Sequence, residues 1–577
     1  MDAKRPANPT AYLTATDGLG RRVEAARQER PGRSVGIFYF LWVGASSWEG
    51  PFDVSKVKQK DPDAGRSSEA WRAAGGGEIG QRHWWGESLF GYFRCSDPWV
   101  VERDVQMLTD AGIDFLGVDF SNATLYPKEL QVLLQTLDKF YRQGFNVPRI
   151  TFITKAKSGA TAMWLYENYY KKYPQYTHLW YSLQGKPLML ADRGDPAVSD
   201  ECRDYFYWRW PQWPKEPFRE NGFPWMDFSE KQVLYGGQTG PTVMSVSLAQ
   251  HTGTLAFSSG ALYKSDKNRT RSWHDGANDH APDAVLYGYN FDEQFAWALE
   301  QDPDIIFITG WNEWIATRQK VWPLRGEPLP DPVILVDNCD INNSRDIQPM
   351  KGGYGDNYYM QMISWIRRYK GLSVVNRNLD TASSAVRTTI DINGPFSQWD
   401  TVTPFYLDYT GDVTPRSHVG WGELYYTDNT GRNDFYKLKM THDGIMLYAY
   451  AQTVQEIKGM GQERCMTLFV STGRENETWN GYDFAIGRAA ACGGRLSVER
   501  WKDGVWQKIG AAAFALKGSE LQLAVPLTLL GLCPDDVHLE FKWADNYQKE
   551  DISSFYLYGD AAPYGRLNFV YEGGSEE

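Results

Sequence analysis

The sequence predicts a (β/α)8 TIM barrel followed by a C-terminal antiparallel β-sandwich. Apolar runs alternate with helical patterns over roughly 340 residues, which is typical of parallel βα units, and barrel domains have about this length. From residue 388 on, short alternating segments separated by turn residues replace that pattern, as in β-sandwiches. At 577 residues the chain is also too long for one ordinary core, so at least two domains are expected.

Eight strands are expected in the barrel, because apolar or β-branched runs recur between helical segments. The strands are expected at 35–43, 115–122, 149–155, 186–191, 204–210, 243–249, 305–308 and 333–337. The helices are expected at 97–112, 127–144, 160–173, 198–203, 291–299 and 357–369. A doubly wound sheet is the main alternative, but no GxGxxG turn follows the first strand.

These elements divide the chain into four parts. They are an N-terminal extension (1–34), a TIM-barrel catalytic domain (35–372), a polar linker (373–387) and a β-sandwich (388–577). The sandwich strands are expected at 435–440, 445–451, 466–470, 495–501, 520–525 and 538–543.

Composition excludes several classes of partner. The net charge of −12 argues against nucleic acid and anionic membranes, both of which need clustered Lys and Arg. No run of eighteen apolar residues or signal peptide is visible, so we expect a cytoplasmic protein, or a secreted or periplasmic one if a signal has been removed. The six cysteines form no CxxC pair, and we expect neither a metal nor a cofactor. The oligomeric state is left open.

Glu313 is the first candidate catalytic residue. The run at 305–308 reads as a strand buried on both faces. It leads into a polar and aromatic cluster: Gly310, Trp311, Asn312, Glu313 and Trp314. A carboxylate between two indoles at the end of a barrel strand favours chemistry on a sugar, which an indole can stack against.

Other polar residues follow strand ends and should converge on the same rim. Asp119 and Glu87 are the candidate catalytic partners of Glu313, because glycoside hydrolysis uses two carboxylates. Asp119 could instead cap the next helix, and Glu87 could bond loop backbone. The further residues expected at this rim are Asn122, Lys155, Asp192, Arg193, Gln250, His251 and Asp337.

The sequence holds 24 Trp, and several flank these positions. The candidate substrate-binding residues are Trp42, Trp84, Trp85, Asn122, Lys155, His251, Trp311, Asn312 and Trp314. For Lys155 and His251, a structural or positioning role is favoured over catalysis. The aromatic run at 205–213 suits barrel packing as well as sugar contacts, and the polar run 337–346 lacks EF-hand spacing and is interpreted as a hydrogen-bonded turn.

The WNEW run resembles glycoside hydrolase families 71 and 99, as do the stretches WWGESLFGYFRCSDPWV, MLTDAGIDFLGVDFSN and SRDIQPMKGGYGDNYY. The resemblance covers about residues 35–372 and implies a (β/α)8 barrel that acts on glycosidic bonds. In the endo-α-mannosidase branch the signature is Glu-Trp-His-Glu with two catalytic glutamates. Here the run is Glu313-Trp314-Ile315-Ala316, so the second carboxylate must come from elsewhere. The C-terminal part resembles family 9 carbohydrate-binding sandwiches.

The sequence therefore predicts a glycoside hydrolase with Glu313 as its leading carboxylate and a carbohydrate as its partner. Two alternatives stay open. One is a non-catalytic carbohydrate-binding protein, favoured by Ala316; the other is a sugar-acting lyase with Lys155 or His251 as its base.

Overall fold

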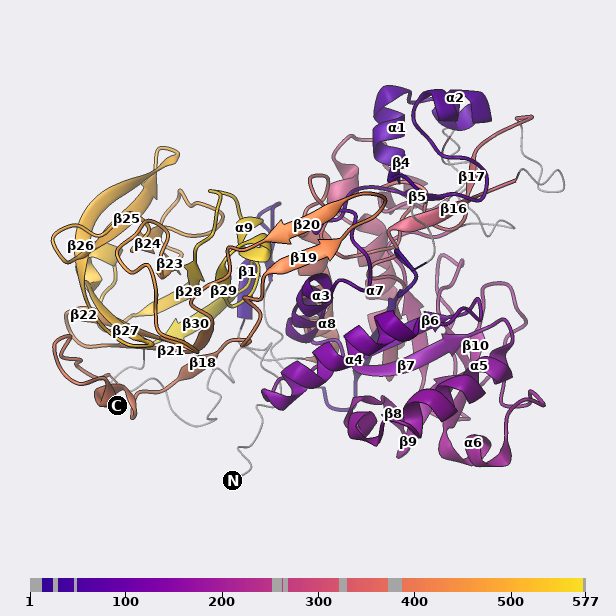
Figure 1. Cartoon of the computed structure of the whole chain (residues 1–577), viewed down its shortest axis with the longest axis horizontal. Helices are drawn as coiled ribbons and strands as arrows, with labels where there is room; N and C mark the ends of the chain where they lie inside the picture. Colours follow the sequence, from indigo (N-terminus) through magenta and orange to yellow (C-terminus); the bar gives the residue numbers. More distant parts are fainter. Residues whose placement is uncertain are drawn as a thin grey trace.

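An α/β domain and an antiparallel β domain lie side by side in the computed structural model (Figure 1). The structure describes residues 13–23, 30–45, 49–251, 262, 268–320, 329–371 and 387–573. The predicted linker lies outside these residues except for Arg387. In the described part of the chain, no helix is both long and apolar enough to span a bilayer.

The α/β domain is built on a parallel sheet that closes almost completely into a barrel. Among the described residues it has eight parallel strands: β3 (Ser34–Tyr39), β6 (Phe115–Phe120), β7 (Arg149–Thr154), β9 (Lys186–Leu190), β10 (Tyr207–Gln212), β11 (Gly222–Pro224), β12 (Val243–Val246) and β15 (Ile305–Ile308). The last strand returns to the first, with Ile305 opposite Ser34. The remaining gap lies between β11 and β12, where the main chain of Tyr235 pairs with that of Val243.

The last predicted barrel strand and the numbering of the later strands need correction. The run at 333–337 is not a barrel strand, because β17 (Ile334–Leu335) pairs antiparallel with β16 (Ile315–Gln319) outside the barrel. The sixth barrel strand is β11, which the sequence did not reveal because it has three residues and no helix before it. Glu313 therefore follows the eighth strand of the barrel, not the seventh.

The predicted helices form close to their expected positions and lie outside the strands (Figure 1). They are α3 (Pro98–Asp110), α4 (Pro127–Arg142), α5 (Ser158–Leu165) continuing into η3 (Tyr166–Tyr170), α6 (Asp200–Tyr205), α7 (Tyr289–Gln301) and α8 (Asn357–Lys370). Asp97 caps α3 by accepting a hydrogen bond from the main chain of Trp99, and Pro98 fits the first turn.

The barrel interior is packed with aromatic rings. Phe115 and Phe307 stack with centroids 6.0 Å apart. Gly36 and Gly117 make room for them, because a Cβ at either position would lie less than 3 Å from one of these rings. Side chains alternate along a strand, so Asp119 faces the interior as Phe115 does, at the carboxyl end of β6.

The loop predicted after the first strand is an ordered insertion. It contributes β4 (Phe52–Asp53), α1 (Val54–Lys60), η2 (Ala64–Arg66), α2 (Ser68–Ala73) and β5 (Arg82–Trp84). The strands β4 and β5 join β16 and β17 in a small sheet above the barrel (Figure 1). This sheet and the two helices share a small core of their own, which includes Trp71 and Ala316.

The C-terminal domain is a large antiparallel sheet region. Its strands follow the order β18 (Phe405–Leu407), β21 (Phe435–His442), β22 (Met446–Thr453), β27 (Glu520–Pro526), β26 (Val505–Lys517), β25 (Leu496–Lys502), β24 (Phe484–Ile486), β23 (Thr467–Ser471), β28 (His538–Asp545) and β30 (Asn568–Glu572). One end of β26 pairs with β25 and the other with β27, so this strand links two groups of strands.

The N-terminal segment belongs to the sheet of the β domain. β1 (Leu13–Thr16) pairs with β30, with Leu13 opposite Phe569, and β2 (Arg22–Val23) pairs with β1. The predicted extension is therefore part of this sheet over residues 13–23, because its alternating LTAT run forms a strand between β30 and the edge strand β2. The first and last strands that the structure describes are therefore paired with each other.

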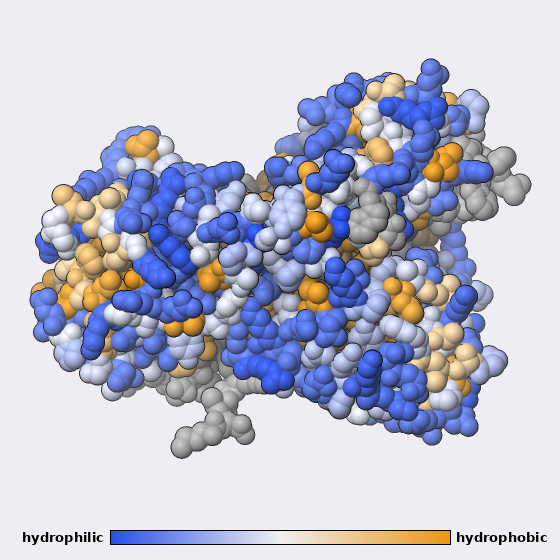
Figure 2. Space-filling view, in the orientation of Figure 1, coloured by the Kyte–Doolittle hydropathy of each residue, from blue (hydrophilic) through white to orange (hydrophobic). Residues whose placement is uncertain are grey.

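A hairpin of the β domain contacts the barrel. It consists of β19 (Arg416–Val419) and β20 (Tyr425–Asp428), which extend toward α3 in Figure 1. The Arg416 guanidinium forms a buried ion pair with Asp97 at 2.9 Å. On the face shown in Figure 2, polar side chains cover most of both domains and apolar ones lie in small patches.

Candidate active site

Glu313 lies where the chain leaves β15, and a glycine lets a second segment approach it. Gly310 has φ 137°, a conformation that favours glycine. A Cβ at this position would lie 2.8 Å from the main-chain oxygen of Arg345 and 2.9 Å from Oδ1 of Asp346. The missing side chain therefore brings residues 345 and 346 against the strand end that carries Glu313.

This second segment fixes Glu313 through hydrogen bonds. The main-chain N–H of Glu313 donates to Oδ1 of Asp346 at 2.6 Å. Nδ2 of Asn338 donates to the main-chain oxygen and to Oε2 of Glu313, both at 2.9 Å. Trp85 donates from Nε1 to the same main-chain oxygen at 3.0 Å. Glu313 is thus held at both its backbone and its carboxyl group.

One guanidinium joins two carboxylates at this site. Nη2 of Arg345 lies 3.5 Å from Oε2 of Glu313 and 3.5 Å from Oδ1 of Asp337. The two carboxylate oxygens are therefore no farther apart than twice that distance. The side chain of Glu313 is 10% exposed and that of Asp337 is 27% exposed, so solvent reaches Asp337 more readily.

Burial and the neighbouring negative charge of Asp337 raise the pKa of Glu313 well above its ordinary value, and Arg345 opposes this. Burial also raises the pKa of Asp337, again opposed by Arg345. Because two nearby carboxyl groups resist ionising together, the pair favours a state with one proton on the more buried member. The geometry therefore suits one acid and one base.

Asp119 lies within electrostatic range of this pair. Its charge contributes to raising the pKa of Glu313, and its own pKa is raised by burial and by Asp337. Oδ1 of Asp119 accepts a hydrogen bond from the main chain of Ser121 at 2.9 Å. Asp119 is thus an electrostatic neighbour of both Glu313 and Asp337, although Asp337 comes from outside the barrel sheet.

His251 is a buried neighbour of Arg345. Its Nε2 lies 3.0 Å from Nη1 of Arg345, and burial and that positive charge lower its pKa well below the ordinary value. The imidazole is therefore neutral. Its Nδ1 and the indole N–H groups of Trp213 and Trp225 are buried without a hydrogen-bond partner among the described residues. Trp225 is itself 5.5 Å from the Arg345 guanidinium.

Glu87 lies in a different environment. Lys351 approaches it at 2.8 Å and Lys56 at 3.5 Å. Burial by itself would raise the pKa of Glu87, but the two ammonium groups outweigh burial and the pKa is lowered. It lines a 700 Å³ cavity between the barrel and the β domain, whose lining does not include Glu313. The structure therefore does not bring Glu87 to the carboxylate pair.

Four tryptophans predicted as a stacking surface are core residues instead. Trp84, Trp85, Trp311 and Trp314 are fully buried, and the indoles of Trp85 and Trp314 stack on each other at 4.1 Å. Asn312 is also fully buried. Its side-chain amide pairs with the main-chain N–H and oxygen of Phe40 at 2.9 and 3.1 Å, as a strand neighbour would. These five residues are therefore core residues and do not form the exposed binding surface that was predicted.

Three predicted binding residues remain accessible. Trp42, just beyond β3, is partly exposed, with the Arg82 guanidinium 5.1 Å from its ring. Asn122 is exposed just beyond β6. Lys155, just beyond β7, pairs with Glu216 and lies 5.7 and 5.6 Å from the rings of Trp210 and Trp213.

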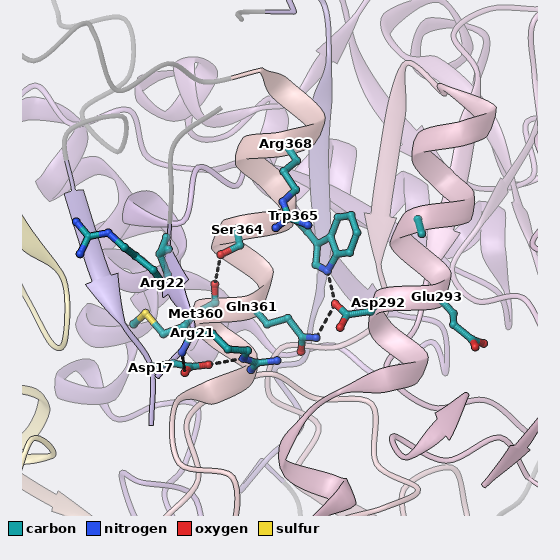
Figure 3. A pocket seen from close by; sticks show the side chains of 12 residues that line it. Asp17, Arg21, Arg22, Asp292, Glu293, Met360, Gln361, Ser364, Trp365 and Arg368 are labelled. Atoms are coloured by element: carbon teal, nitrogen blue, oxygen red, sulfur yellow. Dashed lines mark hydrogen bonds and ion pairs between the residues drawn. The ribbon is translucent and has the colours of Figure 1, made fainter. Parts of the chain in front are cut away.

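A 450 Å³ cavity lies elsewhere, where the N-terminal segment crosses α7 and α8 (Figure 3). There Gln361 and Trp365 both donate to Oδ1 of Asp292, at 2.7 and 2.6 Å. This cavity is outside the barrel and contains none of the predicted site residues.

Sequence reasoning missed the contributions of Asn338, Arg345 and Asp346. The segment 337–346 forms hydrogen-bonded turns, as predicted, with Oδ1 of Asp340 accepting from the main chain of Asn342 and Asn343 at 3.0 Å each. The available signal was its density of Asp, Asn and Arg directly after the apolar run 333–336.

The sequence matches no known protein-family model and no curated protein. Two solved structures of the GH99 endo-α-mannosidase from Bacteroides thetaiotaomicron are similar to this chain. The complex with Bis-Tris-propane is 14% identical with a TM-score of 0.33, and a second structure is 13% identical with a TM-score of 0.34. Each match covers 59% of this chain and 98% of the other.

Proposed function

We propose that this chain is a glycoside hydrolase whose catalytic pair is Glu313 and Asp337. The observation that carries the proposal is the guanidinium of Arg345, 3.5 Å from an oxygen of each carboxylate. It keeps two acidic groups together near the carboxyl ends of barrel strands, where barrel enzymes carry their active sites. Paired carboxylates beside a sugar are the usual equipment for cleaving a glycosidic bond.

The difference in burial supports a proposed role for each member of the pair. Glu313 is the more buried carboxyl and its pKa is raised, so it holds a proton that it can give to the leaving oxygen. Asp337 is more exposed and so can act as base or nucleophile. Retaining enzymes need carboxyl groups about 5 Å apart and inverting enzymes about 6.5–9.5 Å. The upper limit set by Arg345 excludes the wide end of the inverting range.

The proposed sugar contacts are Trp42, Asn122 and the group around Lys155. A partly exposed indole offers a flat apolar face to a pyranose ring, and the unpartnered N–H groups of Trp213 and Trp225 suit hydroxyl oxygens. The C-terminal domain is proposed to be a carbohydrate-binding sandwich or a brace for the barrel. The proposed hydrolysis needs no cofactor.

The test is a glycan panel with four proteins: wild type, Glu313→Gln, Asp337→Asn and Glu87→Gln. Each substitution removes one carboxylate with little change in shape. Glu87 is the matched control, because its partners are lysines outside the pair. The proposal expects loss of at least about 100-fold in kcat for the first two variants and near-wild-type turnover for Glu87→Gln. Equal activity of Glu313→Gln and wild type on a cleaved glycan would refute it.

A non-catalytic carbohydrate-binding protein is the second candidate. Ala316, which occupies the second glutamate position of the mannosidase signature, is buried in the small core of the insertion. Binding of a glycan with no turnover at any pH would favour this candidate. The lyase alternative has less support, because His251 is buried and Lys155 is paired with Glu216.

A further inference from the structure

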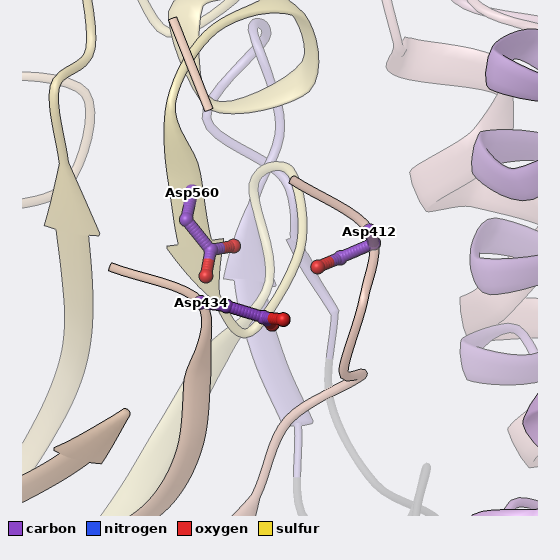
Figure 4. Close-up of side chains that lie close together, drawn as sticks. All are labelled: Asp412, Asp434 and Asp560. Atoms are coloured by element: carbon purple, nitrogen blue, oxygen red, sulfur yellow. The ribbon is translucent and has the colours of Figure 1, made fainter. Parts of the chain in front are cut away.

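Three buried aspartates converge where the β domain meets the barrel. Asp412, Asp434 and Asp560 each offer one carboxylate oxygen, and these oxygens lie within 4.8 Å of one another. Figure 4 shows the three carboxyl groups pointing toward a common space. Asp434 directly precedes β21, and Asp560 begins β29 (Asp560–Ala562). Asp412 lies on the segment that crosses from β18 toward α3.

Two of these carboxylates have an oxygen with no partner. Asp412 is 7% exposed; its Oδ2 accepts from Nε2 of Gln106 at 2.6 Å, but its Oδ1 has no hydrogen-bond partner among the described residues. Asp434 is 9% exposed; its Oδ2 accepts from the main chain of Gly411 at 2.7 Å, and its Oδ1 is likewise unpartnered in the described part of the chain. Leaving such oxygens unpaired costs free energy.

The local negative charge is only partly compensated: Arg103 and Lys139 lie within electrostatic range of Asp412, and Lys542 lies within range of Asp408 and Asp560. Asp408 adds a fourth buried carboxyl group to the same segment, and its Oδ2 has no partner within the described ranges. In those ranges, neither Lys nor Arg forms an ion pair with Asp412, Asp434 or Asp560. These cations donate hydrogen bonds to other oxygens: Lys542 to the main-chain oxygen of Pro563, Arg103 to that of Asp412 itself, and Lys139 to Glu102 and the main-chain oxygen of Gly411. Buried carboxylates normally pair with a cation or bind a metal.

We propose that Asp412, Asp434 and Asp560 bind one Ca²⁺ ion. Carboxylate and main-chain oxygens are the ligands Ca²⁺ prefers, whereas zinc favours nitrogen and sulfur. A cavity of about 10 Å³ lies beside Asp412 and Asp560, which is room for roughly one water-sized particle. Mg²⁺ usually keeps several bound waters and would not fit as well.

The ion would join the two domains. The segment that carries Asp412 is bonded to the barrel through Gln106, and Oη of Tyr409 donates to Oδ1 of Asp110 on α3 at 2.9 Å. The other two ligands belong to the β domain: Asp434 directly precedes β21, and Asp560 begins β29. Ca²⁺ would thus lock the segment between α3 and the sheet. This inference is independent of the proposed glycosidase activity.

Calcium binding is tested on the full chain after treatment with EDTA and dialysis. Titration calorimetry with CaCl₂ should give one site per chain, and elemental analysis after re-dialysis with Ca²⁺ should find one calcium. The thermal unfolding midpoint should rise by about 5 °C at saturating Ca²⁺. MgCl₂ at the same concentration should have a smaller effect.

Asp434→Asn should weaken Ca²⁺ binding at least about 10-fold, because it removes one ligand charge. Asp535→Asn is the matched control, since that side chain is 90% exposed in the same domain. If Asp434→Asn does not fold, Tb³⁺ luminescence of the wild type tests metal binding at this site instead. Tyr556, Tyr558 and Tyr564 line the small cavity and can sensitise a bound lanthanide. Absence of both Ca²⁺ binding and sensitised Tb³⁺ emission in the folded wild type would overturn the proposal, as would unchanged Ca²⁺ binding in a folded Asp434→Asn variant.

Discussion

Nδ2 of Asn338 donates to both the main-chain oxygen and Oε2 of Glu313, at 2.9 Å each. The same nitrogen lies 3.0 Å from Oδ2 of Asp346, and Oδ1 of Asn338 accepts from the main chain of Arg345 at 3.1 Å. One amide therefore ties the proposed acid to the segment that supplies Arg345. The orientation of the Glu313 carboxyl depends on this amide.

Asn338→Ala should reduce kcat on a cleaved glycan by about 10- to 100-fold, because a carboxyl displaced by even 1 Å loses alignment with the leaving oxygen. KM should change less than kcat, since Asn338 is fully buried and does not itself contact substrate. Steady-state kinetics with a circular dichroism check of folding measures this. Asn393→Ala, at an exposed position in the β domain, is the control. A folded Asn338→Ala enzyme with unchanged kcat would contradict the positioning role.

Arg345→Met should move the acidic limb of the kcat/KM pH profile to higher pH. Arg345 lowers the pKa of both Asp337 and Glu313 against the effect of burial. Without that positive charge Asp337 holds its proton to higher pH, so more alkaline conditions are needed to form the base. Arg345→Lys keeps the charge and should shift the limb less. A limb that stays in place or moves to lower pH would count against the assignment of Asp337.

Asp104→Asn should make stability less dependent on pH. Burial raises the pKa of Asp104 from 3.8 to about 7, against hydrogen bonds from Gln348 and Tyr39. The native state therefore holds the proton to higher pH than the unfolded state. The contribution of Asp104 to the unfolding free energy is therefore largest below about pH 4. It decreases as the pH rises toward 7, by up to about 4 kcal/mol in total, and does not change further at higher pH.

Urea unfolding at pH 4.5 and pH 8 measures this difference. The unfolding free energy of Asp104→Asn relative to wild type should be more favourable at pH 8 than at pH 4.5, because the amide stays neutral at both pH values. Asp535→Asn, at an exposed position, should show no such change. The same free-energy difference between Asp104→Asn and wild type at both pH values would exclude the buried proton.

Trp42→Ala and Trp85→Ala should have different effects. Trp85 is fully buried against Trp314, so its truncation should cost about 3–5 kcal/mol of unfolding free energy. Trp42 is partly exposed, so its truncation should raise KM by about 5- to 10-fold, with a smaller loss of stability. Thermal denaturation and kinetics on one glycan separate the two. The Trp42 interpretation fails if its variant binds the glycan as well as wild type.

Local patterns along the chain were enough for much of the architecture. The sequence predicted the helices around Asp97, Pro127 and Asn357 and the first four barrel strands. Helix caps and apolar periodicity depend only on residues close together in the sequence. Glu313 could be placed at the end of a buried strand for the same reason. The short strand β11 could not be predicted, because three residues carry no periodicity.

Tertiary structure decided which carboxylates meet. Asp337 reaches Glu313 from outside the barrel sheet, while Glu87, two residues beyond Trp85, pairs with Lys56 and Lys351 and lines another cavity. Only the packing could tell that the indoles beside Glu313 are buried and that residues 13–16 complete the sheet of the distant C-terminal domain. A residue's own sequence neighbourhood sets its secondary structure, but its burial and charge partners depend on segments that come together only when the chain folds.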